Sequence, residues 1–173
     1  LTTFAPTDQA FNSFLAANNY ASVSTIPEDM LRTLVLYHLQ LEIRTTDLYN
    51  SQYYKTLATI DASQMDVFVS NIDGVFRLND QATVTLADNT VSNGVVHVIN
   101  NVLEIPSVIT LIAANPSFSN LVTGLNQQGL SITLDDNADG SAPFTVFVPS
   151  NAAFTALIAS DPNDDLNTLE DVL

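Results

Sequence analysis

A ten-residue motif occurs twice in this chain and constrains how the chain can fold. TTFAPTDQAF occupies residues 2–11, and TVFVPSNAAF follows at residues 145–154, 143 positions further on. Matching positions include Thr2/Thr145, Phe4/Phe147, Pro6/Pro149, Ala10/Ala153 and Phe11/Phe154. Composition alone would give about one match in such a window. The run EDML at residues 28–31 also returns, as EDVL at residues 170–173. We therefore expect one full repeat period and the start of a second.

The repeat predicts two domain parts that complement each other. Residues 1–105 are expected to form a domain that lacks its leading helices, and residues 106–173 the N-terminal part of a second repeat. An uncovered sheet would expose more apolar surface than soluble monomers usually carry. Helices over residues 107–128 are therefore expected to cover a sheet built from residues 39–103. Docking within one chain would produce a permuted domain, and docking between chains a domain-swapped dimer or an open polymer.

The net charge excludes one class of partner. Four Lys and Arg residues against 19 Asp and Glu residues leave a formal charge of −15. Phosphate backbones and anionic lipid surfaces would repel such a chain, so nucleic acid is not an expected partner. The dispersed acids are typical of a well-solvated surface, with specific cation binding as the alternative. The chain contains no cysteine, and the sequence predicts neither a transmembrane segment nor a signal peptide.

The N-terminal pattern predicts a strand that turns into a helix. Residues 2–5 have the character of a short strand, and Thr7 is placed to cap the helix that follows. Pro27 opens a second helix. After that helix Leu39, Leu41 and Ile43 alternate with polar residues, as in a half-buried strand.

The middle of the chain predicts a meander of short antiparallel strands. Residues 67–69 and 75–78 flank an Asp-Gly turn, and residues 83–86 add a strand that ends before Asp88. Residues 95–99 are apolar on both faces except for His97, which predicts a central strand covered on both sides. The strands and helices do not alternate regularly, so the expected class is α+β.

Helical spacing returns after Pro106. Apolar residues over 108–125 predict two short helices, broken at Asn115-Pro116. Ile132 and Leu134 predict a brief strand, and the second strand-to-helix corner is expected to begin at Phe144.

Three motifs together carry a family resemblance. Residues 2–11 resemble the first signature of fasciclin-like domains, Tyr37-His38 resembles their central tyrosine-histidine pair, and residues 93–103 resemble their second signature. The motifs follow the family's order and cover the chain. The resemblance implies a fasciclin-like wedge of two short β-sheets with packed helices. It also implies an extracellular, secreted or surface-anchored module of adhesion and matrix proteins.

Histidine placement argues against catalysis. His38 and His97 are the only histidines, and a hydrolase or metal enzyme would have to use one of them. His97 alternates with Val95 and Ile99, which favours a buried, hydrogen-bonded core residue. His38 follows a helix end and is expected to bond either the carbonyls there or the strand-to-helix corner of residues 2–11. No nucleophile elbow, phosphate loop or zinc-helix motif is present. We therefore predict no catalytic residue, and the resemblance implies partner contact at Tyr37 and His38.

One acidic loop has the opening spacing of a calcium site. Asp135, Asn137 and Asp139 alternate ahead of Gly140, as in loops that wrap a hard cation. The position for the bidentate glutamate is Val146, so the signal is incomplete and an ordinary Asp/Asn/Gly loop is favoured. No other cofactor is expected.

Two further clusters have simpler interpretations. The acidic residues at 161–165 are consistent with a helix stop followed by caps for the next helix. Tyr53-Tyr54 beside Lys55 is either an exposed contact patch in a loop or half-buried packing.

These patterns favour an adhesion module at the cell surface that binds a protein or glycan without catalysis. The alternative is a structural subunit of a surface fibre or polymer, assembled as incomplete domains complete one another. An enzyme or small-ligand carrier would require a polar pocket around His38.

Overall fold

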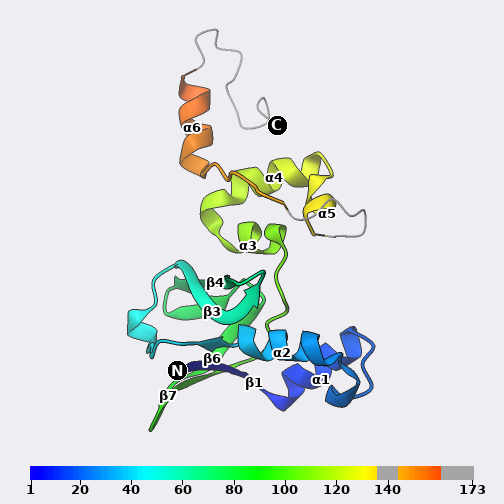
Figure 1. The fold of residues 1–173 in the computed structure, drawn as a ribbon. Coiled ribbons are helices and arrows are strands. Elements are labelled where there is room, and N and C mark those ends of the chain that lie inside the picture. Colours follow the sequence, from blue (N-terminus) through cyan, green and yellow to red (C-terminus); the bar gives the residue numbers. More distant parts are fainter. Residues whose placement is uncertain (136–143, 161–173) are drawn as a thin grey trace. The chain divides into compact units, whose positions relative to one another are not determined.

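The computed structural model describes residues 1–135 and 144–160. The chain forms two compact units, Leu1–Ile105 and Pro106–Leu173. The first contains a sheet with helices beside it, and the described part of the second is helical (Figure 1). The predicted α+β class is confirmed.

The first unit is built on seven connected strands. Their spatial order is β2-β1-β7-β6-β5-β4-β3. The strands are β1 (Thr2–Pro6), β2 (Leu39–Gln40), β3 (Gln52–Ile60), β4 (Ser63–Ile72), β5 (Val75–Leu78), β6 (Ala82–Val91) and β7 (Gly94–Ile99). β5 and β6 pair only at Arg77 opposite Thr83 and Leu78 opposite Ala82. The two expected sheets are thus joined through one short pairing.

β1 and β7 form the parallel pair of this sheet, whereas its other pairings are antiparallel. Thr2 lies opposite Val95, and Pro6 lies opposite Ile99. Gly94 is required at the start of β7, because a Cβ there would overlap the carbonyl oxygen of Leu1. The predicted central strand is confirmed, since β7 lies between β1 and β6.

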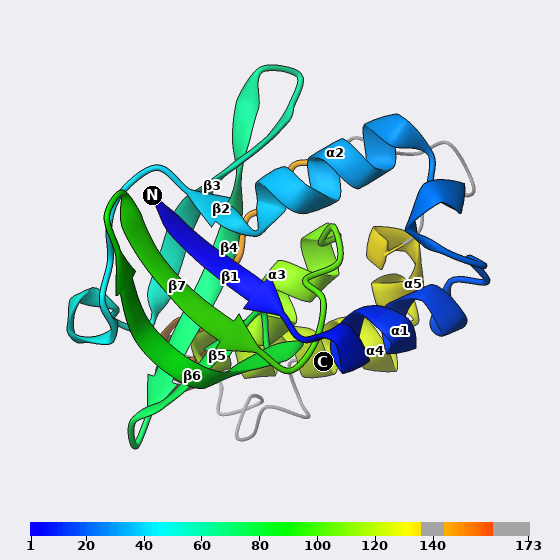
Figure 2. The ribbon, with the colours of Figure 1, turned by 90° about the horizontal axis from the view of Figure 1, so that it is seen from below.

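β1 leads directly into α1 (Asp8–Ala17), as Figure 2 shows. The Thr7 hydroxyl caps this helix by accepting a hydrogen bond from the Ala10 N–H at 3.1 Å. Pro27 precedes α2 (Glu28–Tyr37), as predicted. Two 3-10 turns, η1 (Val23–Thr25) and η2 (Thr46–Leu48), complete the unit.

Two apolar clusters fill the first unit. The cluster against the sheet includes Phe4, Tyr37, Tyr49, Tyr54, Val67, Val69, Leu78, Ile99 and Leu103. The cluster between the helices includes Phe14, Ile26, Leu34 and Val102. Because apolar burial is the main favourable term in folding, these clusters hold the helices against the sheet.

Two strand predictions in this unit were wrong in extent. β2 ends at Gln40, and Leu41 and Ile43 are 75% and 58% exposed rather than half-buried in a strand. β6 continues through Asp88 to Val91, because register shifts in its pairing with β7 absorb the irregularity. Asp88 takes a φ of 60°, one of the non-glycine residues with positive φ.

The described part of the second unit consists of helices. They are α3 (Val108–Ala114), η3 (Pro116–Phe118), α4 (Ser119–Gln127), α5 (Leu130–Asp135) and α6 (Asn151–Ala159). The predicted break at Asn115-Pro116 is confirmed. The strand expected at Ile132 and Leu134 was wrong, because these residues lie in α5 and Ile132 is 76% exposed.

The second copy of the repeated motif only partly repeats the first. Ser150 caps α6 through the Ala153 N–H at 3.3 Å, just as Thr7 caps α1. Residues 144–150, however, form no strand, and Phe147 is 90% exposed where Phe4 is buried. A strand needs a neighbouring strand for its backbone, whereas a helix satisfies its own. The described residues of this unit supply no such neighbour.

Among the described residues, no single helix has the length and apolar content to cross a membrane. Val108–Ala114 and Pro116–Gln127 meet those criteria only as a pair, bent by 103°.

Candidate functional site

Tyr37 and His38 lie where α2 ends and the chain turns toward β2. Tyr37 is fully buried and His38 is 6% exposed. Neither side chain therefore reaches the surface to contact a partner directly, contrary to the simplest form of the expectation. Partner binding at this pair stays a prediction. The contact would be made by exposed neighbouring residues that the pair holds in position.

The Tyr37 hydroxyl joins α2 to the sheet. It donates to the Asp66 carbonyl at 2.7 Å and accepts from the Asn79 side-chain amide at 2.8 Å. The other end of that amide accepts from the Phe68 N–H at 2.8 Å. Burial raises the pKa of the Tyr37 hydroxyl well above its ordinary value, so the group stays neutral. Asn79 directly follows β5 with a φ of 52°, and its sequence context gives no sign of this buried role.

His38 uses both ring nitrogens on the main chain. The Leu103 N–H donates to Nε2 at 2.9 Å, which requires Nε2 to be unprotonated. The proton is therefore on Nδ1, which donates to the Leu34 carbonyl at 2.8 Å. Burial lowers the pKa of the imidazole below its ordinary 6.5. The ring links the end of α2 to the segment after β7 as a neutral group.

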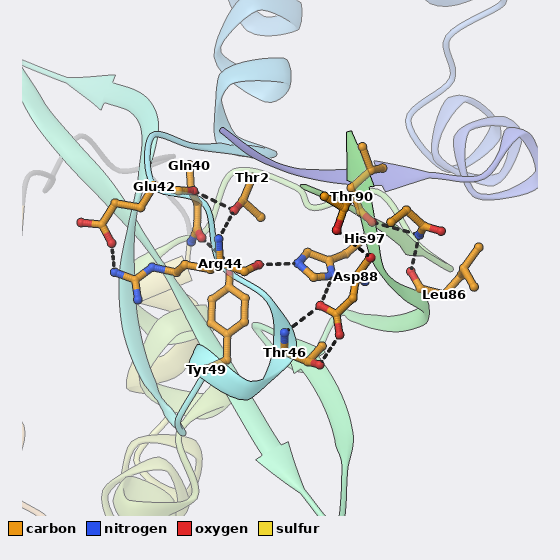
Figure 3. Close-up of polar contacts among 12 residues, drawn as sticks. Thr2, Gln40, Glu42, Arg44, Thr46, Tyr49, Leu86, Asp88, Thr90 and His97 are labelled. Carbon is orange, nitrogen blue, oxygen red and sulfur yellow. Dashed lines mark hydrogen bonds and ion pairs between the residues drawn. The ribbon is translucent and has the colours of Figure 1, made fainter. Parts of the chain in front are cut away.

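His97 holds a second junction in the same way (Figure 3). The Asp88 N–H donates to Nδ1 at 3.2 Å, so Nε2 carries the proton and donates to the Arg44 carbonyl at 2.9 Å. The Asp88 carboxylate in turn accepts from the Thr46 N–H at 2.7 Å. His97 is 1% exposed and stacks on Phe4, with ring centroids 5.7 Å apart. The prediction of a buried, hydrogen-bonded His97 is confirmed.

These bonds decide what the histidines can do chemically. A general base needs a ring nitrogen that is free to take a proton from a substrate. In both rings the unprotonated nitrogen already accepts from a backbone N–H, and the other donates to a backbone carbonyl. The geometry therefore assigns both imidazoles to structural bonds.

The calcium candidates are only partly within the described residues. The Asp135 carboxylate accepts from the Ser107 hydroxyl at 2.6 Å, which ties the end of α5 to the start of α3. Asn137 and Asp139 lie outside the described residues. Among residues 1–135 and 144–160, no group of three or more His, Asp or Glu side chains could hold a metal ion. Calcium binding at this loop stays a prediction.

An apolar groove lies beside the Tyr37-His38 pair. It encloses about 170 Å³ between β1, α1 and α2 and is lined by Phe4, Pro6, Phe11, Leu34, Val35, His38 and their neighbours. Val35 is 48% exposed at this groove. The two buried bonds of His38 fix the C-terminal end of α2, which forms one wall. The groove is thus the surface that the buried hydrogen bonds of His38 hold in shape.

The Tyr37 network predicts a measurable stability loss. In Tyr37→Phe the Asn79 amide and the Asp66 carbonyl both lose their partner, so we expect the free energy of unfolding to fall by about 1–3 kcal/mol. Urea unfolding monitored by circular dichroism measures it. Tyr20→Phe is the matched control, because within the described part of the chain the Tyr20 hydroxyl bonds the Met30 sulfur alone, at 3.2 Å. An equal loss in both variants would contradict the assignment.

The lowered pKa of His38 predicts acid sensitivity. In the unfolded chain the imidazole has a pKa of about 6.5, which is above its pKa in the folded state. The contribution of His38 to the free energy of unfolding is therefore fully present above about pH 6.5. It should be lost as the pH falls below about 6.5 toward the folded pKa. Urea unfolding at a series of pH values should show this decline, and His38→Gln should reduce it. Tyr37→Phe should keep the decline, since no group that titrates in this range is removed. A decline unchanged in His38→Gln would assign it to other groups.

Comparison with known proteins agrees with this fold. The Fasciclin domain model matches residues 1–106 and 116–173. The chain is 25% identical over 177 residues to the transforming growth factor-beta-induced protein ig-h3 of Sus scrofa, covering 99% of this chain and 25% of that protein. The chain thus spans about a quarter of this curated relative.

A solved structure has the same fold. The FAS1 domain pair from the insect cell adhesion molecule fasciclin I superimposes with a TM-score of 0.60 at 20% identity, covering 98% of this chain and 59% of that one. The family match extends over nearly all of the sequence, and the sheet, the capped corner and the tyrosine-histidine pair all lie within it. This chain therefore belongs to the fasciclin domain family.

Proposed function

We propose that this chain is a non-catalytic adhesion module of the cell exterior that binds a protein or glycan partner through its first unit. The observation that carries the proposal is the neutral, doubly bonded state of both histidines within a fasciclin domain. It leaves surface recognition as the function the geometry favours. The solved neighbour fasciclin I is, by its printed title, a cell adhesion molecule, which suggests the same setting. This link is one of family and not of mechanism.

The apolar groove is the contact surface we propose. Its walls are apolar and held in shape by buried hydrogen bonds. An apolar side chain of a protein partner can therefore bind there with little loss of conformational entropy in the groove. The chain as a whole carries a formal charge of −15. Cationic partners should therefore be attracted, and less so as salt rises.

Adhesion should depend on Val35. Immobilised protein should retain cells under washing, and Val35→Ser should weaken partner binding by about fivefold through a lost apolar contact. Val75→Ser is the matched control, because Val75 is 45% exposed on β5, away from the groove. Retention is counted at low and high salt. Retention equal to that of an inert acidic protein would contradict the adhesion proposal, and equal losses in the two variants would contradict the groove.

A second candidate function is assembly by complementation, favoured by one contact in the second unit. Asn151, the first residue of α6, accepts from the Asn120 N–H at 3.0 Å and donates to the Pro116 carbonyl at 3.0 Å. This side chain holds η3 and α4 against α6. By the internal repeat, Asp8 occupies the equivalent position at the start of α1. Asp8 is exposed, and no described residue donates a hydrogen bond to its carboxylate. The proposed occupant is residues 116–127 of a second copy.

Chemistry at position 8 makes this candidate testable. A carboxylate can accept from Asn120 but cannot donate to the Pro116 carbonyl. Asp8→Asn should therefore strengthen self-association by about tenfold, because the change adds one hydrogen bond and removes a negative charge that repels the second copy. Light scattering of the full chain across a concentration series measures its mass. Asp29→Asn, the same change at the start of α2, is the control. A monomer at every concentration in Asp8→Asn, or an equal gain in Asp29→Asn, would contradict assembly at this face.

A further inference from the structure

A second cavity opens on the first unit, away from the apolar groove. It encloses about 380 Å³ between residues 40–44 and the β3-β4 hairpin. No residue that lines it also lines the groove. Its size lies within the usual range for small-ligand sites. Tyr53 and Tyr54 belong to its wall as residues of β3, where Tyr53 is half-buried and Tyr54 buried, so the packing alternative holds rather than the exposed loop patch.

The cavity gathers positive charge in an acidic chain. Of the four Lys and Arg residues in the sequence, Arg44 and Lys55 line this cavity, and Glu42 is the one acid in its lining. Lys55 is 58% exposed and pairs with Asp66 at 2.7 Å. Half of the chain's Lys and Arg side chains thus lie at this cavity, where they reduce the repulsion that an anion meets from the rest of the molecule.

Arg44 is held ready for an anion. Its guanidinium lies over the Tyr54 ring, 4.9 Å from the centroid. It pairs with Glu42, whose side chain is 68% exposed and free to turn into water (Figure 3). A ligand carboxylate could take the place of Glu42 on a guanidinium whose position is already fixed, and arginine binds carboxylates in a planar, two-pronged geometry.

Gln40 contributes an unused hydrogen-bonding group. It is 2% exposed, and its Oε1 accepts from the Tyr49 hydroxyl. Its Nε2 has no hydrogen-bond partner among residues 1–135 and 144–160. Exchanging the two ends of the amide would leave the oxygen orphaned instead, so one polar atom lacks a partner either way. Buried polar groups are almost always hydrogen-bonded, so this unpaired nitrogen is available to donate to a ligand.

The rest of the lining selects the chemistry of that partner. Gln52 and Gln64 add amides, which match hydroxyls that both donate and accept. Tyr53 adds a ring whose face can pack against C–H groups. Amides, aromatic rings and two cations together suit a hydroxyl-rich ring that carries a carboxylate. We propose that this cavity binds an acidic saccharide, with Arg44 and Lys55 on the carboxylate and Gln40 on an adjacent oxygen.

Titration of the full chain with a uronate disaccharide tests the proposal. Two-dimensional amide NMR spectra should show saturable shifts confined to residues 40–64. Arg44→Gln/Lys55→Gln should raise the dissociation constant about tenfold or more through the loss of two charge-assisted contacts. The main-chain bonds of Arg44 to Thr2 and His97 are untouched by this change. Arg77→Gln is the control, because Arg77 pairs with Asp80 at 2.9 Å outside the cavity.

Gln40→Glu tests the orphan amide separately. The change keeps the size of the side chain and places a negative charge at the proposed oxygen contact, so uronate binding should be lost. The amide spectrum of the free variant reports whether it folds; if it does not, the Arg44/Lys55 variant decides. Absence of saturable shifts, or an equal loss in Arg77→Gln, would overturn the site. Equal affinity for the neutral disaccharide would overturn the acidic ligand, and equal affinity for acetate would overturn the saccharide. None of these outcomes bears on adhesion through Val35.

Discussion

The parallel pairing of β1 with β7 joins residues 2–6 to residues 95–99, and both histidine junctions of the first unit depend on it. It places Phe4 opposite His97, so that the rings stack and the imidazole reaches the Arg44 carbonyl. It also brings the segment after β7 back to α2, where the Leu103 N–H bonds His38. Without this pairing neither histidine would have its main-chain partners, and the residue 40–48 segment would not be held against the sheet.

Buried polar side chains work in this unit as neutral connectors between segments far apart in the chain. Tyr37 and Asn79 join α2 to β4, His38 joins α2 to residue 103, and His97 joins residue 44 to β6. Each is satisfied on both sides, which is the condition under which burying a polar group is not costly. Gln40 departs from this pattern, and its orphan nitrogen is the feature that distinguishes its cavity from the structural junctions.

Comparison of the two copies of the motif shows which predictions a sequence can support. The helix halves agree, because Thr7 and Ser150 each satisfy a backbone N–H three residues away. The strand halves differ, because Phe4 lies in a paired strand and is buried, whereas Phe147 is 90% exposed. A similar limit explains Ile132, whose apolar neighbours at alternate positions predicted a strand although the segment is helical. Local patterns cannot specify a partner strand that lies elsewhere in the chain.

The sequence by itself determined the α+β class, the helix cap at Thr7, the break at Pro116 and a buried His97, because each follows from short-range chemistry or strong periodicity. The family signatures followed from residue identity alone. Only the tertiary structure decided that Tyr37 and His38 are buried, that Asn79 and Leu103 bond them, and that Arg44, Lys55 and Gln40 meet at one cavity. These partners lie up to 65 residues apart. Their meeting depends on strand register and helix packing, which no local pattern encodes.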